Sequence, residues 1–192
     1  MSQSVYQKVM KADFEQLPKG LRILHGVKQE IVVTGLCDIT SGTHWSSKMI
    51  RPLLGLPATE TQARCKVVIT PSNKGETWHR TMGESQFNSQ QWAGDSLVFE
   101  QVGFSRLAFQ MVVEKGKLHY QLSKLSIFGL PIPQFLWSEV RAVESMKNGY
   151  IHFDIRANGV FSHLLVKYEG LLDKVTSDGT VVWEKEGGPN ES

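Results

Sequence analysis

The amino-acid sequence predicts a mainly β protein: an antiparallel up-and-down meander of about nine or ten strands, curled into a barrel or half-barrel. Two observations predict this fold. Glycines recur at mostly strand-sized intervals from Gly75 to Gly170, and several stand in turn dipeptides such as Lys115-Gly116, where a positive φ lets the chain reverse. The intervening segments alternate apolar and polar residues, as half-buried strands do. A sheet of this size closes or curls because twist accumulates and open edges invite aggregation.

Residues 1–27 are predicted to be helical in two pieces. Apolar residues from Val5 to Leu17 recur at helical spacing, and Pro18 suits the first turn of a second helix. Residues 30–40 form the first strand, because β-branched residues there alternate with polar ones. A short amphipathic helix is expected after it, ending at residues 55–57, whose sequence is Gly-Leu-Pro.

The long meander follows this helix. Its six strand candidates, joined by tight turns, are residues 63–70, 76–82, 85–92, 96–102, 104–115 and 117–128. Two prolines within residues 129–133 then interrupt the pattern, because proline removes a ladder donor. Residues 139–146 suit either a strand or a helical turn. Residues 150–156 and 160–172 are expected to pair as a hairpin over Asn158-Gly159, and residues 180–183 form a last short strand.

Composition bounds the class of protein. The 192 residues fit one β-rich domain over residues 1–183, with a flexible tail at 184–192. Hydrophobic residues make up 41%, charged residues 21% and the net charge is +2, which is typical of a soluble globular protein and disfavours nucleic-acid binding. The chain shows no secretory signal or membrane-length apolar run, so we expect a cytoplasmic protein without stable membrane insertion. Cys37 and Cys65 are interpreted as buried, reduced thiols, and the sequence sets no oligomeric state.

Polar residues that share a strand face with apolar ones are the candidate binding residues. Arg80 shares a strand face with Trp78, and Arg106 and Tyr120 each share a face with apolar residues in two other strands. In a barrel with an internal cavity, such groups would hold the polar end of a small hydrophobic or amphipathic molecule. The same logic adds two further candidates, Arg156 and Tyr168. The competing interpretation places arginine stems along the outer surface with their heads in water, and a single bulge inverts the assignment of faces.

No motif for catalysis, metal or cofactor binding is present. The six histidines show no metal-ligand spacing, and the sequence has no nucleophile elbow and no glycine-rich phosphate loop. We therefore expect no cofactor and no metal. His119, His152 and His163 are expected to face solvent. The carboxylates of the C-terminal third are assigned to solvated faces; they are Glu139, Glu144, Asp154 and Glu169.

Two other functions stay open. The first is an enzyme that needs no cofactor, such as an isomerase, using His79, His119 or Tyr120 as acid or base in the same pocket. The second is a protein-interaction module, in which residues 126–137 form an exposed apolar patch.

The order of a strand, a helix and a long meander resembles the calycin-like barrels of the lipocalins and fatty-acid-binding proteins in topology. Sequence phrases also resemble a bacterial domain-of-unknown-function family, number 4166, often found C-terminal to saccharopine-dehydrogenase-like NAD-binding domains. The phrases include Leu24-His25-Gly26, Trp78-His79-Arg80, Phe153-Asp154-Ile155 and the Gly-Leu-Pro-Ile-Pro run at residues 129–133. The resemblance spans residues 17 to 172. It implies an accessory or ligand-presenting role beside a dehydrogenase-like partner, and we expect no NAD-binding domain within these 192 residues.

Overall fold

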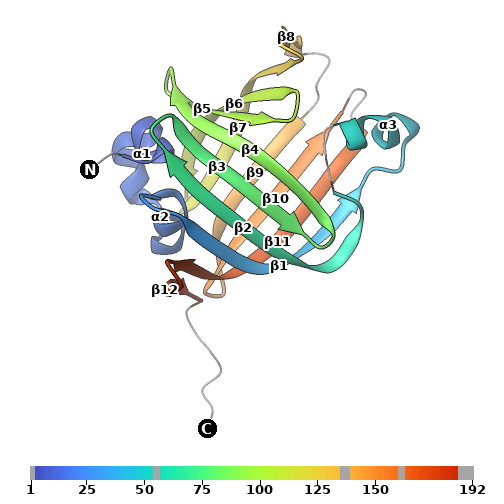
Figure 1. Ribbon diagram of the computed structural model, residues 1–192. Coiled ribbons are helices and arrows are strands. Elements are labelled where there is room, and N and C mark those ends of the chain that lie inside the picture. The colour runs from blue at the N-terminus through green and yellow to red at the C-terminus, as the bar shows by residue number, and fades with distance from the viewer. Residues whose placement is uncertain (1–2, 54–56, 135–138, 160–162, 186–192) are drawn as a thin grey trace.

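The structure of the chain is a computed structural model that describes residues 3–53, 57–134, 139–159 and 163–185 (Figure 1). As expected, the N-terminal segment is helical. The helices are α1 (Val5–Met10), the 3-10 helix η1 (Lys11–Gln16), α2 (Lys19–His25) and α3 (Trp45–Leu53). Ser4 caps α1, because its hydroxyl accepts a hydrogen bond from the Gln7 amide while the Gln7 side chain accepts one from the Ser4 amide. The short helix predicted after the first strand is α3.

The strands follow the predicted meander. They are β1 (Ile31–Ser41), β2 (Glu60–Ser72), β3 (Gly75–Met82), β4 (Ser85–Gly94), β5 (Leu97–Val102), β6 (Ser105–Glu114), β7 (Lys117–Ile127), β8 (Leu130–Pro131), β9 (Glu139–Lys147), β10 (Tyr150–Asn158), β11 (Leu164–Ser177) and β12 (Thr180–Glu184). The ambiguous segment at 139–146 is therefore part of a strand. Residues 160–162 of the last predicted hairpin and 186–192 of the predicted tail lie outside the described residues.

Within the described residues, ten of these strands close into an antiparallel barrel. Consecutive strands pair from β1 to β7, then β9, β10 and β11, and β11 pairs back onto β1. The two short strands β8 and β12 are added to β7 and β11. At the closing seam the register shifts between Thr34 and Gly35, where a Cβ on Gly35 would collide with the carbonyl oxygen of Leu171. The predicted mainly β meander is confirmed, and of the two forms left open by the sequence, barrel or half-barrel, the structure shows the closed barrel.

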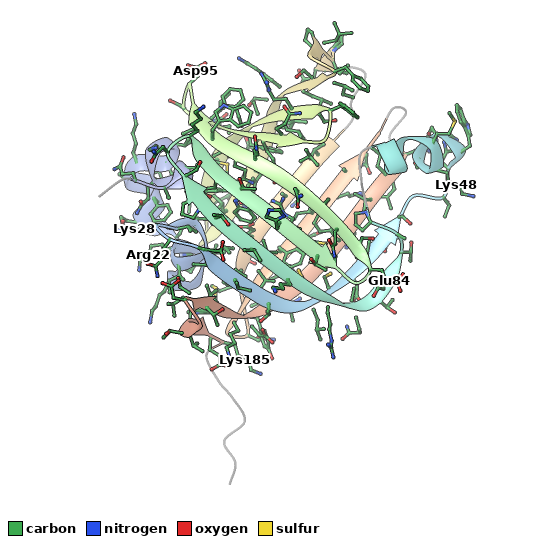
Figure 2. The ribbon with its side chains drawn as sticks, in the orientation of Figure 1. Arg22, Lys28, Lys48, Glu84, Asp95 and Lys185 are labelled. Carbon is green, nitrogen blue, oxygen red and sulfur yellow. The ribbon has the colours of Figure 1, made fainter. Side chains whose placement is uncertain are left out.

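The N-terminal helices cover one end of the barrel. In Figure 1, α1 and α2 lie together at one end and α3 at the other. Contacts agree with this view, since α1 touches β4 and β5 while α2 touches β9, β10 and β12. Apolar side chains hold the helices in place, and Leu21 and Leu24 of α2 are buried. Charged side chains such as Lys48, Glu84 and Asp95 stand on the periphery (Figure 2).

Among the described residues, the barrel wall is least paired between β7 and β9. The pairs recorded between these two strands cover Leu118–Gln121 of β7, whereas β6 and β7 pair along their whole length. Beyond that stretch Ser126 and Ile127 of β7 pair with β8 instead. The prolines at 131 and 133 explain why β8 is only two residues long, because they cannot donate to a ladder. None of the described helices combines the length and apolarity needed to span a bilayer.

Candidate functional site

A cavity of about 390 Å³ lies inside the barrel. Its walls are mainly apolar, with side chains such as Phe87, Leu107, Phe109, Leu125, Ile155 and Leu165. These residues come from strands on all sides, because alternate residues of each strand point inward. Leu125 and Val140 line it from β7 and β9, beyond the short stretch where those strands pair. The closed barrel therefore keeps an unfilled apolar interior.

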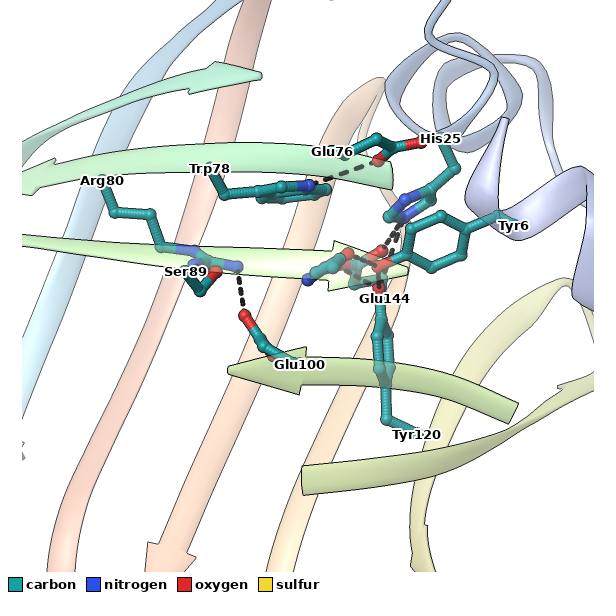
Figure 3. A network of polar contacts seen from close by, with 10 residues as sticks. Tyr6, His25, Glu76, Trp78, Arg80, Ser89, Glu100, Tyr120 and Glu144 are labelled. Carbon is teal, nitrogen blue, oxygen red and sulfur yellow. Dashed lines mark hydrogen bonds and ion pairs between the residues drawn. The ribbon is translucent and has the colours of Figure 1, made fainter. Parts of the chain in front are cut away.

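Five polar residues gather where the N-terminal helices meet this cavity, and we call them the floor cluster: Tyr6, His25, Gln91, Tyr120 and Glu144 (Figure 3). The Tyr6 hydroxyl donates to Gln91 Oε1 at 2.9 Å and lies 3.2 Å from the Tyr120 hydroxyl. Tyr120 donates to Glu144 Oε1 at 3.1 Å. His25 Nε2 lies 2.5 Å from Glu144 Oε2. A continuous hydrogen-bonded chain therefore joins α1, α2, β4, β7 and β9.

His25 is held by ring contacts as well as by its carboxylate. It is 0% exposed, and its ring centroid lies 4.0 Å from that of Tyr6 and 5.9 Å from that of Trp78. As the last residue of α2, it follows Leu21 and Leu24 on the apolar face of that helix. Its Nδ1 is buried and has no hydrogen-bond partner among the described residues. The imidazole is thus fixed behind Glu144, which itself lines the cavity.

Burial keeps the phenols of the cluster neutral. Removal from water, with the Glu144 charge nearby, raises the pKa of both Tyr6 and Tyr120 well above the ordinary value. Burial also raises the pKa of Tyr168, higher in the cavity, to about 12. These hydroxyls are therefore hydrogen-bond donors and do not act as anions near neutral pH.

Glu76 anchors the first helix to the barrel. One of its oxygens accepts from the Val5 amide at 3.1 Å, and the other accepts from Trp78 Nε1 at 3.3 Å. The residue is 3% exposed, and burial raises the pKa of its carboxyl above the usual range despite these hydrogen bonds. Glu76 therefore ties the start of α1, and with it Tyr6, to β3.

A second polar group, the Arg80–Glu100 pair, lies on the cavity wall. Arg80 Nη2 donates to Glu100 Oε1 at 3.1 Å and Arg80 Nη1 donates to Ser89 Oγ at 2.6 Å. The guanidinium carbon also lies 4.8 Å from the ring centroid of Trp78 and 5.6 Å from that of Phe87. Burial opposes the charged form of Arg80, but Glu100 together with the nearby Tyr168 and Tyr6 more than offsets it, so the pKa of the guanidinium is raised.

Four of the six predicted binding residues line the cavity and two do not. Trp78, Arg80, Tyr120 and Tyr168 are cavity residues. Arg106 and Arg156 instead stand exposed on the outer face, the former with its guanidinium carbon 5.5 Å from the ring centroid of Trp92. The physical reason is strand parity: Leu107 and Ile155 point inward, so their neighbours point outward.

The histidine and carboxylate assignments also need correction. His79 is exposed and does not line the cavity, and neither does His119, so Tyr120 alone remains of the three predicted acid–base residues. Glu144, which the sequence assigns to a solvated face, is only 8% exposed because it shares the inner face of β9 with Val140 and Ala142. Sequence reasoning also missed Tyr6, although it stands beside buried Val5 in an apolar stretch.

The apolar patch expected over residues 126–137 is partly present. Phe128 and Leu130 are each 68% exposed, and the Phe128 ring stacks on Phe104 at 4.6 Å between centroids. Ile132 is half-buried and lines the cavity. Trp137 lies outside the described residues. The patch therefore consists of Phe104, Phe128 and Leu130 at the β6–β8 corner.

Comparison with known proteins gives one match. A family model described as a domain of unknown function, DUF4166, matches residues 17–172. No curated protein and no solved structure matches the chain. The matched segment includes His25, Glu76, Arg80, Tyr120 and Glu144.

Proposed function

Since this chain belongs to the DUF4166 family, whose description names no activity, we propose from the geometry of its barrel that it binds a small hydrophobic or amphipathic molecule in the interior. The observation that carries the proposal is the cavity of about 390 Å³ with apolar walls and a polar floor. This volume falls in the range of about 300–1,000 Å³ typical of small-molecule sites. An apolar body would lie between Leu107, Phe109 and Leu165, and a polar end would reach the floor cluster.

The polar groups are placed as such a site requires. Buried hydroxyls and carboxylates in a sealed core would cost stability unless fully paired, and a packed apolar core would serve folding better. Here Glu100, Tyr120 and Glu144 all border the cavity. A ligand that meets these groups gains orientation as well as apolar contact, which is how small-molecule sites combine affinity with specificity.

The test uses N-phenyl-1-naphthylamine, an uncharged dye that fluoresces in apolar surroundings, and native mass spectrometry of the protein as purified. The wild type is expected to bind the dye one to one. Ala142→Phe fills the cavity beside Glu144 and should weaken dye binding at least tenfold, whereas Arg141→Phe, the exposed neighbour on β9, should leave it unchanged. A wild type that binds neither dye nor a co-purifying molecule would overturn the proposal.

A second candidate is a cofactor-independent enzyme of the isomerase type, favoured by the meeting of Glu144 and Tyr120 at the cavity surface, with His25 behind Glu144. A carboxylate and a neutral phenol within hydrogen-bond reach can act as base and acid in one proton transfer. 5-Nitrobenzisoxazole tests this chemistry, because loss of its C–H proton to a base breaks the N–O bond and releases a nitrile phenolate. The wild type should accelerate this reaction over buffer and Glu144→Gln should not. A wild-type rate equal to that of Glu144→Gln would refute the enzymatic function.

A further inference from the structure

The charges of the cavity wall bear on what kind of polar end it accepts. Arg80 is the arginine that lines the cavity, and its charge is already engaged by Glu100 at 3.1 Å, Ser89 at 2.6 Å and two aromatic faces. An anionic head at this guanidinium would have to share its charge with Glu100, because Glu100 and Ser89 already take two of its N–H donors. Two negative charges would then lie close together beside one cation in an apolar interior, which is costly.

The carboxylates keep capacity to accept further hydrogen bonds. Each carboxylate oxygen has two lone-pair positions. Glu144 receives one hydrogen bond at each oxygen, from Tyr120 and from His25, and Glu100 receives its hydrogen bond from Arg80 at Oε1. Both residues line the cavity. A donor such as an ammonium or a hydroxyl can therefore add to either carboxylate without breaking an existing contact.

The net charge of the cavity wall also favours a head group without negative charge. Two carboxylates, Glu100 and Glu144, and one guanidinium, Arg80, line the cavity. The imidazole of His25, if protonated, raises the sum only to zero. Neutral donors are also present, because the hydroxyls of Tyr168 and Ser105 border the cavity and Ser105 Oγ has no partner among the described residues. Among the described residues, the wall thus suits a cationic or neutral head, because an anion there would meet two carboxylates and a guanidinium already paired with Glu100.

We propose that the ligand is an apolar molecule whose polar end is a hydrogen-bond donor without negative charge, an amine or an alcohol, and that carboxylates and phosphates are rejected. This inference rests on the proposed binding function and narrows its ligand class. The amine or hydroxyl donates to Glu144 or Glu100, and its apolar chain lies along Leu107 and Leu165.

The experiment measures displacement of N-phenyl-1-naphthylamine by decylamine, decanol and decanoate, which share one chain length and differ in the head. Near neutral pH, where the amine is cationic and the acid anionic, decylamine and decanol should each compete at least tenfold more strongly than decanoate. Decanoate competing as well as decylamine, or better, would overturn the inference while leaving the binding function intact. Failure of the dye itself to bind would remove the binding function.

Variants that remove one charge show which carboxylate binds the amine head. Glu144→Gln keeps the size and the acceptor oxygen while removing the charge, so it should weaken decylamine about tenfold and decanol less than threefold. Glu169→Gln, a 39% exposed carboxylate on the outer face, is the matched control and should change neither. Equal loss of decylamine and decanol in Glu144→Gln would contradict a charge-specific role. If Glu144→Gln fails to fold by circular dichroism, Glu100→Gln makes the same test, and the wild-type ranking still decides.

Discussion

The Arg80–Glu100 pair should show strong energetic coupling. Replacing Glu100 by Leu leaves a guanidinium facing an apolar cavity, which typically costs about 3 kcal/mol. Replacing Arg80 by Met leaves the carboxylate instead and also removes the hydrogen bond to Ser89, for a cost of about 4 kcal/mol. Removing both leaves an apolar wall, and we expect the double variant to lose about 2 kcal/mol.

The expected coupling follows from the distance. Two unit charges 3.1 Å apart attract by about 5 kcal/mol when the effective dielectric constant is near 20. The assay is a double-mutant cycle on the free energy of unfolding in urea, followed by tryptophan fluorescence. The control is Lys167–Glu169 on the outer face, whose atoms are also 3.1 Å apart but whose side chains are each 39% exposed. That cycle should give less than about 1 kcal/mol.

The two pairs have the same N–O distance and differ strongly in burial; they differ also in the cation and in the second partner of Glu169, which is His152 at 2.8 Å. Equal coupling in both cycles, or single-variant costs at Arg80 and Glu100 that simply add, would refute the reasoning. The pair would then be solvated from the cavity, and its charge would be open to an anionic ligand. The result therefore also bears on the ligand class inferred above.

Three further predictions use the same unfolding assay. Tyr120→Phe removes the hydroxyl that donates to Glu144 and should lose about 1.5–3 kcal/mol; a loss below about 0.5 would show that the hydroxyl is solvated in the folded state. Burial raises the pKa of the Glu76 carboxyl in the folded protein, so the folded protein keeps the carboxyl proton at a pH where the unfolded chain has released it. The stability that this group contributes is therefore lost as the pH rises through the folded-state pKa. The wild type should therefore gain stability relative to Glu76→Gln on acidification from about pH 7 to about pH 5, and a constant difference would contradict this. Gly35→Ala should cost about 3 kcal/mol because its Cβ meets a backbone carbonyl of β11, whereas Gly129→Ala, at φ 79° in open space, should cost about 1 kcal/mol; equal costs would show that the β1–β11 seam relaxes.

The sequence predicts the meander well because its signals are local. A turn at Lys115-Gly116 and alternation on either side involve residues close in the chain, and they recur from hairpin to hairpin. The break after Gly129 is equally local, since β8 ends at Pro131 after two residues and Pro133 follows, and neither proline can donate to a ladder. Closure follows from twist and from the cost of open edges rather than from any single residue.

Which face of a strand points into the barrel is harder to predict, as Arg106 shows. Its strand alternates Ser105, Leu107 and Phe109 on one face and has apolar Phe104 and Ala108 on the other, so both faces look suitable for a core. The structure points Leu107 and Phe109 inward and shifts the register between Ala108 and Phe109. A strand with two apolar faces carries little information on which one lines the interior.

Of the floor cluster, Tyr120 is predictable from strand alternation, and its partners are not. Tyr6 lies 114 residues from Tyr120, and His25 lies 119 residues from Glu144. The one local signal is that His25 and Glu144 each occupy a position on an apolar face, which a buried partner must compensate. That partner is supplied only when the N-terminal helices dock on the barrel. The helices therefore do more than cover the end of the barrel: α2 brings the imidazole that contacts Glu144, and α1 brings the phenol of Tyr6, which contacts Tyr120. In the proposed function, these contacts hold the carboxylate that receives the polar end of the ligand.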